Sequence, residues 1–171
     1  DALLALAEAH DCRRVRLLAY FGEASAPCGN CDNCLQPPAT WDGTEAARKL
    51  LSCIYRFHQH GGWRAPRAFG AVHLIDVLRG KRTERVEQFG HAELSTFGIG
   101  AELSESQWRA VVRQLLALGH LRAEGEYHTL VLTDSSRAVL RGEVEARLRV
   151  PAEKEPRSGR GRKGRGSGAA R

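Results

Sequence analysis

Residues 28–34 read Cys-Gly-Asn-Cys-Asp-Asn-Cys, and a fourth cysteine, Cys12, precedes Cys28 by fifteen intervening residues. Two thiolates in a Cys-x2-Cys turn can converge on one ion while backbone N–H groups point at the sulfurs, and Gly29 permits the tight backbone that this needs. Four thiolates favour Zn²⁺ in a closed tetrahedron with Zn–S distances of about 2.3 Å, which leaves no position for water. The spacing therefore predicts one structural, non-catalytic zinc, with the ligands Cys12, Cys28, Cys31 and Cys34.

An iron–sulfur cluster is the main rival, because Cys-x2-Cys-x2-Cys also opens the run of bacterial ferredoxins. Here the fourth cysteine lies upstream and Cys34 is followed by Leu-Gln-Pro-Pro, which favours zinc. The arginines beside the first cysteine (Arg13, Arg14 and Arg16) either offset the negative charge of four thiolates or form a solvent face. The fifth cysteine, Cys53, lies on the apolar stripe of an expected helix and should be a buried, inert thiol.

The overall composition is that of a globular protein. The chain has 171 residues, 42% hydrophobic and 27% charged, which predicts one compact domain plus a smaller module. No run approaches the roughly 18 apolar residues needed to cross a bilayer, so we exclude a membrane-spanning protein, collagen and a wholly disordered chain. We find no phosphate-binding loop and no supported nucleophile–base set, and expect no catalysis from this chain. Because it begins at Asp1 and has no Met, we expect it to be a piece of a longer protein.

The positive charge is concentrated at one end. The chain carries 26 Lys and Arg against 20 Asp and Glu, and residues 151–171 hold seven of the former and two of the latter. The first 150 residues are therefore nearly neutral, at a net +1. The tail has no hydrophobic periodicity, so we expect a disordered linker, which could also hold phosphates weakly and without sequence preference.

The apolar periodicity predicts a mainly helical chain. In order, it predicts a helical segment over residues 1–22, a helix capped by Thr44, a short helix over 70–79 with Val72, Ile75 and Leu78 or Val77 inward, a helix opened by the capping box 104–107, a hairpin over 121–133 and a helix over 134–141. Three helices followed by a hairpin are typical of a winged helix-turn-helix domain. We therefore predict an α+β, mainly α fold: a helical zinc-binding module at 1–41, a winged-helix DNA-binding domain at 42–150 and a disordered basic tail at 151–171.

Longer motifs now point to a family. The run Cys12-Arg-Arg-x-Arg-Leu-Leu-Ala-Tyr-Phe-Gly-Glu, with Pro27-Cys-Gly-Asn-Cys-Asp-Asn-Cys-Leu-x-Pro-Pro, closely resembles the zinc-binding module of bacterial RecQ-type DNA helicases. Five later motifs resemble the winged-helix (RQC) region that follows this module in the family: Val77-Leu-Arg-Gly, Gly90-His91-x-x-Leu94, Phe97-Gly-Ile-Gly100, Trp108-x4-Arg113-Gln-Leu and Leu140-Arg-Gly. The resemblance extends from residue 1 to about residue 151, and assigns the zinc ligands to the same four cysteines.

The resemblance implies a motorless part of an ATP-dependent 3′→5′ DNA helicase of recombination and repair. Two RecA-like ATPase lobes would lie upstream, and only they would need ATP and Mg²⁺; the C-terminal helical HRDC domain of the family is not in this sequence. The zinc module would brace the winged helix against the motor, and the winged helix would hold duplex or forked DNA. It further implies a monomer in the bacterial cytoplasm, associated with the nucleoid and not with a membrane.

The best candidate for a DNA contact is the basic segment 79–85, Arg-Gly-Lys-Arg-Thr-Glu-Arg, which holds four cations and one Glu. It lies in the helix-turn-helix region of the expected fold. Contacts to phosphates position a protein without reading sequence, which suits an enzyme that acts at any fork. We therefore expect phosphate contacts from Arg79, Lys81, Arg82 and Arg85, although a solvated charged loop is the alternative.

Three further residues are weaker candidates. Ser104, at the start of the third helix, could donate to a phosphate or only cap its helix. His91 occupies a motif position and is either structural or a DNA contact. In the hairpin, Glu124 and Glu126 would repel phosphates, and Tyr127 is the aromatic available for stacking. Because some eukaryotic relatives split base pairs with a long wing that has an aromatic tip, we predict that this short wing is not the strand-separating pin.

Two other functions fit parts of the sequence. The chain could be a free-standing winged-helix transcription regulator with a zinc or redox sensor, but a closed set of four cysteines and the lack of a coiled-coil heptad argue against this. It could also be a protein-interaction module anchored by Trp41 and Trp63. Both tryptophans could equally pack in the core or between the modules.

Overall fold

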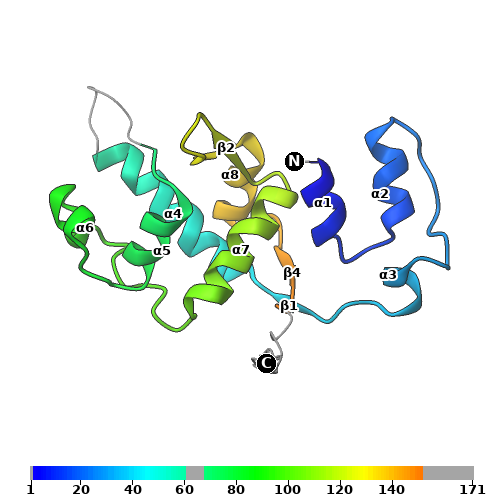
Figure 1. The fold of residues 1–171 in the computed structure, drawn as a ribbon, viewed down its shortest axis with the longest axis horizontal. Coiled ribbons are helices and arrows are strands. Elements are labelled where there is room, and N and C mark those ends of the chain that lie inside the picture. The colour runs from blue at the N-terminus through cyan, green and yellow to red at the C-terminus, as the bar shows by residue number, and fades with distance from the viewer. Residues whose placement is uncertain (1, 61–67, 152–171) are drawn as a thin grey trace, which may run out of the picture.

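The computed structural model describes residues 2–60 and 68–151 (Figure 1). Its N-terminal part is helical and lies at one end of the elongated molecule. This part consists of α1 (Ala2–Glu8), α2 (Arg13–Tyr20) and α3 (Asp32–Leu35). The rest comprises β1 (Thr40–Asp42), α4 (Thr44–His60), α5 (Ala71–Leu78), α6 (Glu84–Gln88), the 3-10 turn η1 (His91–Glu93), α7 (Glu105–Ala117), β2 (Leu121–Glu124), β3 (Thr129–Leu132), α8 (Asp134–Arg141) and β4 (Arg147–Arg149). The predicted α+β, mainly α fold is confirmed.

The single helical segment predicted over residues 1–22 is in fact two helices. Alpha-helix α1 ends at Glu8, and α2 begins after Cys12, which is its N-cap residue. The side-chain amide of Asn33 occupies the break, because its Nδ2 donates to the carbonyls of Ala9 at 2.8 Å and Asp11 at 2.9 Å. The break turns Cys12 toward the other cysteines, which a continuous helix could not do.

Alpha-helix α4 begins one residue differently from the prediction. Thr44 is its first helical residue and not its cap, because the carboxylate of Asp42 accepts the backbone N–H of Thr44 at 3.0 Å and its hydroxyl at 2.5 Å. The expected apolar stripe of α4 is buried, including Leu50, Leu51 and Ile54.

The core of the C-terminal part is formed where α4, α5 and α7 pack together. In α5, Leu74, Val77 and Leu78 are fully buried. The prediction that Val72 faces inward is wrong, since its side chain is 57% exposed. Leu74 and Leu78 share the buried face of the helix, because they are four residues apart. Val72 precedes Leu74 by two residues and therefore lies on the opposite side. Its neighbour His73 is buried instead.

The capping box that opens α7 and the hairpin that follows are confirmed. The Ser104 hydroxyl accepts the backbone N–H of Gln107, and the Gln107 side chain accepts the backbone N–H of Ser104. Beyond α7, Gly119 has φ +75°, a left-handed conformation that glycine adopts at helix C-termini. Strands β2 and β3 then pair in antiparallel register from Leu121↔Leu132 to Glu124↔Thr129.

A second small sheet was not predicted. Strands β1 and β4 pair antiparallel, with Trp41 opposite Leu148. The pairing closes the C-terminal part, and the Thr44 hydroxyl strengthens it by accepting the backbone N–H of Ala146 at 2.9 Å. Among the described residues, no helix combines the length and apolar character needed to cross a membrane.

Candidate metal centre and nucleic-acid interface

Four cysteine sulfurs converge at the N-terminal end of the molecule. The Sγ atoms of Cys12, Cys28, Cys31 and Cys34 all lie within 4.8 Å of one another. The sulfurs of Cys12 and Cys28 are 3.6 Å apart, close to the edge of about 3.8 Å of a tetrahedron with 2.3 Å bonds. Within residues 2–60 and 68–151, these are the residues whose side chains form a metal-ligand cluster. The predicted four therefore fit a closed zinc site.

Local backbone geometry prepares these thiols for metal binding. Gly29 has φ +71°, as the tight first turn requires. The backbone N–H of Cys28 donates to Cys12 Sγ at 3.3 Å and is the main cause that lowers the pKa of Cys12 to about 6. The backbone N–H of Arg13 lowers the pKa of Cys31. Hydrogen bonding to Cys31 raises the pKa of Cys34 to about 11, so zinc must displace a proton there.

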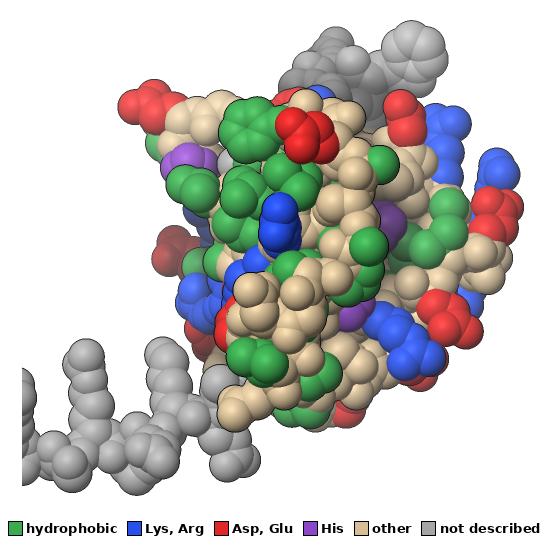
Figure 2. Space-filling view, turned by 90° about the vertical axis from the view of Figure 1, so that its right-hand side faces the viewer, with side chains coloured by type: hydrophobic (Ala, Val, Ile, Leu, Met, Phe, Trp, Pro, Cys, Tyr) green, Lys and Arg blue, Asp and Glu red, His purple; other side chains and the backbone are tan. Residues whose placement is uncertain are grey.

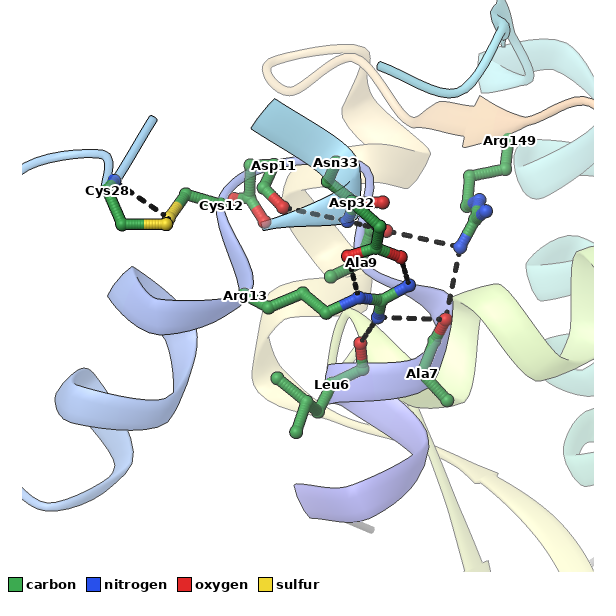
Figure 3. Close-up of polar contacts among 10 residues, drawn as sticks. All are labelled: Leu6, Ala7, Ala9, Asp11, Cys12, Arg13, Cys28, Asp32, Asn33 and Arg149. Carbon is green, nitrogen blue, oxygen red and sulfur yellow. Dashed lines mark hydrogen bonds and ion pairs between the residues drawn. The ribbon is translucent and has the colours of Figure 1, made fainter. Parts of the chain in front are cut away.

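The arginines beside Cys12 mainly serve the protein fold. Arg13 forms a bidentate ion pair with Asp32, with Nε–Oδ1 and Nη2–Oδ2 distances of 2.7 and 2.8 Å (Figure 3). The hydrogen bond to Asp32 is the main cause that raises the pKa of Arg13, and attraction to the Cys31 thiolate raises it less. Arg16 pairs with Asp11 at 2.5 Å. Backbone N–H groups therefore do more than these arginines to favour the thiolate forms of Cys12 and Cys31.

Cys53 is the buried, inert thiol that the sequence predicts. Its side chain is fully buried in α4, and burial raises its pKa to about 12. It therefore stays protonated at neutral pH and, lying outside the metal cluster, is free of any ligand role.

The basic segment 79–85 lies beside acidic residues from three helices. Lys81 Nζ is 3.3 Å from Asp76 Oδ1 of α5 and 3.3 Å from Glu105 Oε2 of α7. Arg82 Nη1 is 2.9 Å from Glu87 Oε1 of α6. The count of four cations against one acid in the sequence therefore overstates the local charge, because folding brings these carboxylates to the segment.

The other two cations of the segment are placed differently. Arg79 caps the C-terminal end of α5 and is half-buried, and its Nε has no hydrogen-bond partner in the part of the chain that the structure describes. Arg85 lies in α6, with its guanidinium 5.9 Å from the centre of the Phe69 ring. The last two residues of the segment, Glu84 and Arg85, are thus helical, and the Thr83 hydroxyl caps the helix by accepting the backbone N–H of Val86.

Ser104 lies close to this segment in space. The Lys81–Glu105 contact places the N-terminus of α7 beside the basic residues. The Ser104 hydroxyl is exposed and lies 3.0 Å from the hydroxyl of Ser106 while it caps α7. The structure therefore brings Lys81 and Ser104, predicted from separate motifs, to one surface.

His91 is not on this surface. It is 2% exposed, its Nδ1 lies 2.7 Å from Nε2 of His73, and its ring stacks on Phe57 with centroids 4.3 Å apart. Burial and the positive charge of Arg85 lower the pKa of His73 to about 4, so His73 is neutral at pH 7. Of the two roles that the sequence left open for His91, the structure favours the structural one, because its buried ring belongs to the aromatic core.

The remaining predicted residues are dispersed. Tyr127 is 84% exposed in the turn between β2 and β3, and Arg122 pairs with Glu124 in the same wing. Trp41 is half-buried against the hydrophobic core, which supports the packing interpretation. Trp63 and the tail from residue 152 lie outside the described residues.

The sequence interpretation missed Asp32, Asn33 and Arg149, which make contacts around the metal cluster. Asp32 and Asn33 are the two residues between Cys31 and Cys34. Asp32 binds the Arg13 side chain of α2, and Asn33 binds carbonyls in the break between α1 and α2. Arg149 of β4 donates to carbonyls at the end of α1. A signal was present for the first two, since a polar pair inside a ligand turn often makes hydrogen bonds that orient the ligands.

Comparisons with known proteins agree with these observations. Residues 1–35 match a family described as RecQ zinc-binding, and residues 37–157 match the RQC domain. The ATP-dependent DNA helicase RecQ of Haemophilus influenzae is 41% identical over 154 residues, which cover 88% of this chain and 24% of the helicase. The RecQ helicase of Pasteurella multocida is 40% identical, with coverages of 88% and 23%, and that of Bacillus subtilis is 32% identical over 136 residues, with coverages of 78% and 22%. The chain spans about a quarter of the length of these relatives.

With the four-cysteine cluster, the zinc-binding match shows a structural Zn²⁺ site.

Proposed function

The chain belongs to the RQC domain family, and on that premise we propose that it is the non-catalytic zinc and winged-helix part of a RecQ-like 3′→5′ DNA helicase. In this proposal it holds duplex DNA at a fork without reading sequence, and ATP is hydrolysed elsewhere in the complete protein. The observation that carries it is the identity of about 40% over 88% of the chain to proteins named ATP-dependent DNA helicase. The same relatives favour this function over that of a transcription regulator.

An apolar face supports docking to the ATPase lobes of the complete protein. An open groove of about 580 Å³ is lined by exposed hydrophobic side chains of α1, of α2 and of the residue that follows α2: Leu3, Leu17, Tyr20 and Phe21. Figure 2 views the molecule from this end and shows hydrophobic side chains gathered on its surface. Exposed apolar patches of this kind mark protein interfaces. We place the contact between the zinc module and the motor here.

The DNA contact in this proposal is the surface around the N-terminus of α7. Lys81, Arg82 and Arg85 contribute cations, and Ser104 contributes a hydroxyl at the N-terminus of a 13-residue helix. Helix N-termini attract anions. Glu105 and Glu87, which pair with Lys81 and Arg82, are exposed, and exposed ion pairs contribute only about 0–1 kcal/mol, so a phosphate can replace them. Asp76, the other partner of Lys81, is more covered and would keep its contact.

A change in the salt dependence of binding tests this surface. We expect the triple variant K81A/R82A/R85A to bind forked duplex DNA more weakly and to flatten the slope of log affinity against log salt by ~0.9 for each phosphate contact removed. The measurement is fluorescence anisotropy of a labelled fork over a series of salt concentrations. The triple variant R48A/R56A/R141A removes the same charge from exposed positions on α4 and α8 and should leave most of the slope unchanged. An unaltered slope in the first variant would refute the surface.

A second prediction concerns the wing. Tyr127 is exposed at its tip, but the wing is short and carries Glu124 and Glu126, which repel phosphates. We therefore expect Tyr127→Ala in the complete helicase to change the unwinding rate by less than about twofold, since in this proposal the ring stacks on no base during strand separation; a lost stack would be worth about 1–3 kcal/mol. Strand-displacement assays with ATP hydrolysis measured in parallel test this. Loss of unwinding with intact ATP hydrolysis would instead identify the wing as the strand-separating pin.

A further inference from the structure

The end of α1 lies between the metal cluster and the winged helix (Figure 3). Carbonyls at the C-terminal end of a helix have no partner within that helix, so they need donors from elsewhere. The carbonyl of Ala9 has two. Asn33 Nδ2 donates to it at 2.8 Å from α3, and Arg149 Nη1 donates to it at 3.2 Å from β4. Because Ala9 is 2% exposed, water cannot readily replace either donor.

On the metal side, the position of Asn33 depends on two ligands. Asn33 lies between Cys31 and Cys34 and is buried, and its amide also donates to the carbonyl of Asp11 at 2.9 Å. The turn that these cysteines close therefore fixes the amide against the end of α1. Asn30 has the same place in the first turn, between Cys28 and Cys31, but it is exposed and makes no side-chain hydrogen bond within the described structure.

On the winged-helix side, Arg149 connects three elements. Its guanidinium donates to the carbonyls of Ala7 at 3.1 Å and Ala9 at 3.2 Å. Its backbone N–H donates to Oε1 of Gln114 in α7 at 2.5 Å, and its carbonyl accepts from Nε2 of the same side chain at 3.1 Å. It also pairs with Thr40 of β1. A shift of the α1 end would therefore move or break the hydrogen bonds that Arg149 of β4 makes to it.

We propose that Asn33 and Arg149, by sharing the carbonyl of Ala9, couple zinc occupancy to the anchoring of β4 in the winged helix. While the four thiolates hold the ion, the Cys31–Cys34 turn keeps Asn33 on the α1 end, and the carbonyl stays directed at Arg149. When the ion leaves, the turn loosens, the α1 end is released and Arg149 loses its acceptors. Arg149 is thus a positioning residue, and its role rests on the zinc site and not on the proposed DNA surface.

Amide exchange followed by NMR on the 171-residue chain tests the coupling. In the natural sequence, chelation of zinc should speed exchange of the Arg149 and Val150 amides roughly five- to tenfold, as expected for the loss of one or two hydrogen bonds, while the Leu115 amide in the core changes little. In the variants N33A and R149M, the same β4 amides should already exchange at the faster rate with zinc bound, and chelation should add less than about twofold. The double variant should behave like either single variant, because both remove the same link.

Two matched variants control for general loosening. N30A removes the equivalent amide from the first turn, and R109M removes an exposed arginine of α7 that pairs with Glu105 within its own helix. Both should keep the full response of β4 to zinc. Zinc per chain is measured for every variant, and exchange is compared at saturating zinc. If N33A and R149M retain slow exchange with zinc and the full response to chelation, the proposal is overturned. This outcome does not depend on DNA binding, so the two proposals can fail separately.

Discussion

Chelation of zinc is expected to unfold residues 2–39 while the winged-helix core stays folded. This part of the chain has almost no core of its own, since α1 and α2 contain no buried residue, and Ala9, Cys12 and Asn33 are the residues buried before β1 among those described. Metal binding to a four-thiolate site can contribute on the order of 10 kcal/mol to folding. Backbone NMR spectra with and without a chelator should therefore show α2 and α3 signals collapsing to random-coil positions, while those of α4 and α7 persist.

Two cysteine substitutions distinguish a metal effect from the loss of any thiol. Cys31→Ser removes a sulfur of the cluster and should reproduce the chelated state even with zinc present. Cys53→Ala removes a buried thiol that lies outside the cluster and should leave α2 and α3 folded with zinc bound. Retention of protected amides in α2 and α3 after complete metal removal would show that the module folds without the ion.

Trp108→Ala is expected to destabilise the winged helix by about 3–5 kcal/mol, the cost of removing a buried aromatic side chain. Trp108 is fully buried in α7, and its indole N–H donates to the carbonyl of Gly100 at 2.8 Å. The fit is close, because a Cβ added to Gly100 would lie 2.4 Å from Cζ2 of the indole. The loss would be a large part of the roughly 5–15 kcal/mol typical of a domain. Urea unfolding followed by circular dichroism measures it without relying on tryptophan emission.

Two other substitutions set the scale for this result. Trp108→Phe keeps most of the apolar volume but removes the shorter of the two hydrogen bonds to the buried Gly100 carbonyl, leaving the one from the Leu103 backbone N–H at 3.4 Å, and should cost about 1–3 kcal/mol. Tyr127→Ala removes an aromatic ring that is already exposed, and should change stability by less than about 0.5 kcal/mol. A cost below about 1 kcal/mol for Trp108→Ala would mean that the indole does not occupy the core as described.

Local signals predicted the elements that depend on neighbouring residues. The capping box of Ser104 and Gln107, the final helix over 134–141 and the cysteine turns all rely on contacts within a few residues, and the structure contains each of them. Features that depend on distant partners were missed. Strands β1 and β4 have three residues each and pair across about a hundred residues of chain, so no pattern in either one indicates the other. The break between α1 and α2 depends on the amide of Asn33, which is distant in sequence, and so could not be predicted from the pattern of residues 1–22.

The net charge around the basic segment could not be predicted from the sequence, for a related reason. A count of charges along residues 79–85 omits Asp76, Glu87 and Glu105, which folding brings to the same cations. The sequence left open whether His91 is structural or contacts DNA, because its motif carries no information about burial, whereas the structure packs it between His73 and Phe57. Sequence spacing can thus identify a metal site, whose ligands must converge, more securely than a phosphate surface, whose net charge depends on every neighbouring element.

The most direct test of the zinc-organised fold is elemental analysis of the purified chain combined with its absorbance spectrum. One zinc per chain, with no absorbance in the visible range, is the expected result, since Zn²⁺ has a filled d shell and the cluster offers four thiolates. Cys53→Ala should retain the full zinc content, and Cys31→Ser should not. Iron with inorganic sulfide in the coloured protein, or a chain without stoichiometric metal in which α2 and α3 remain folded, would contradict a fold organised by zinc.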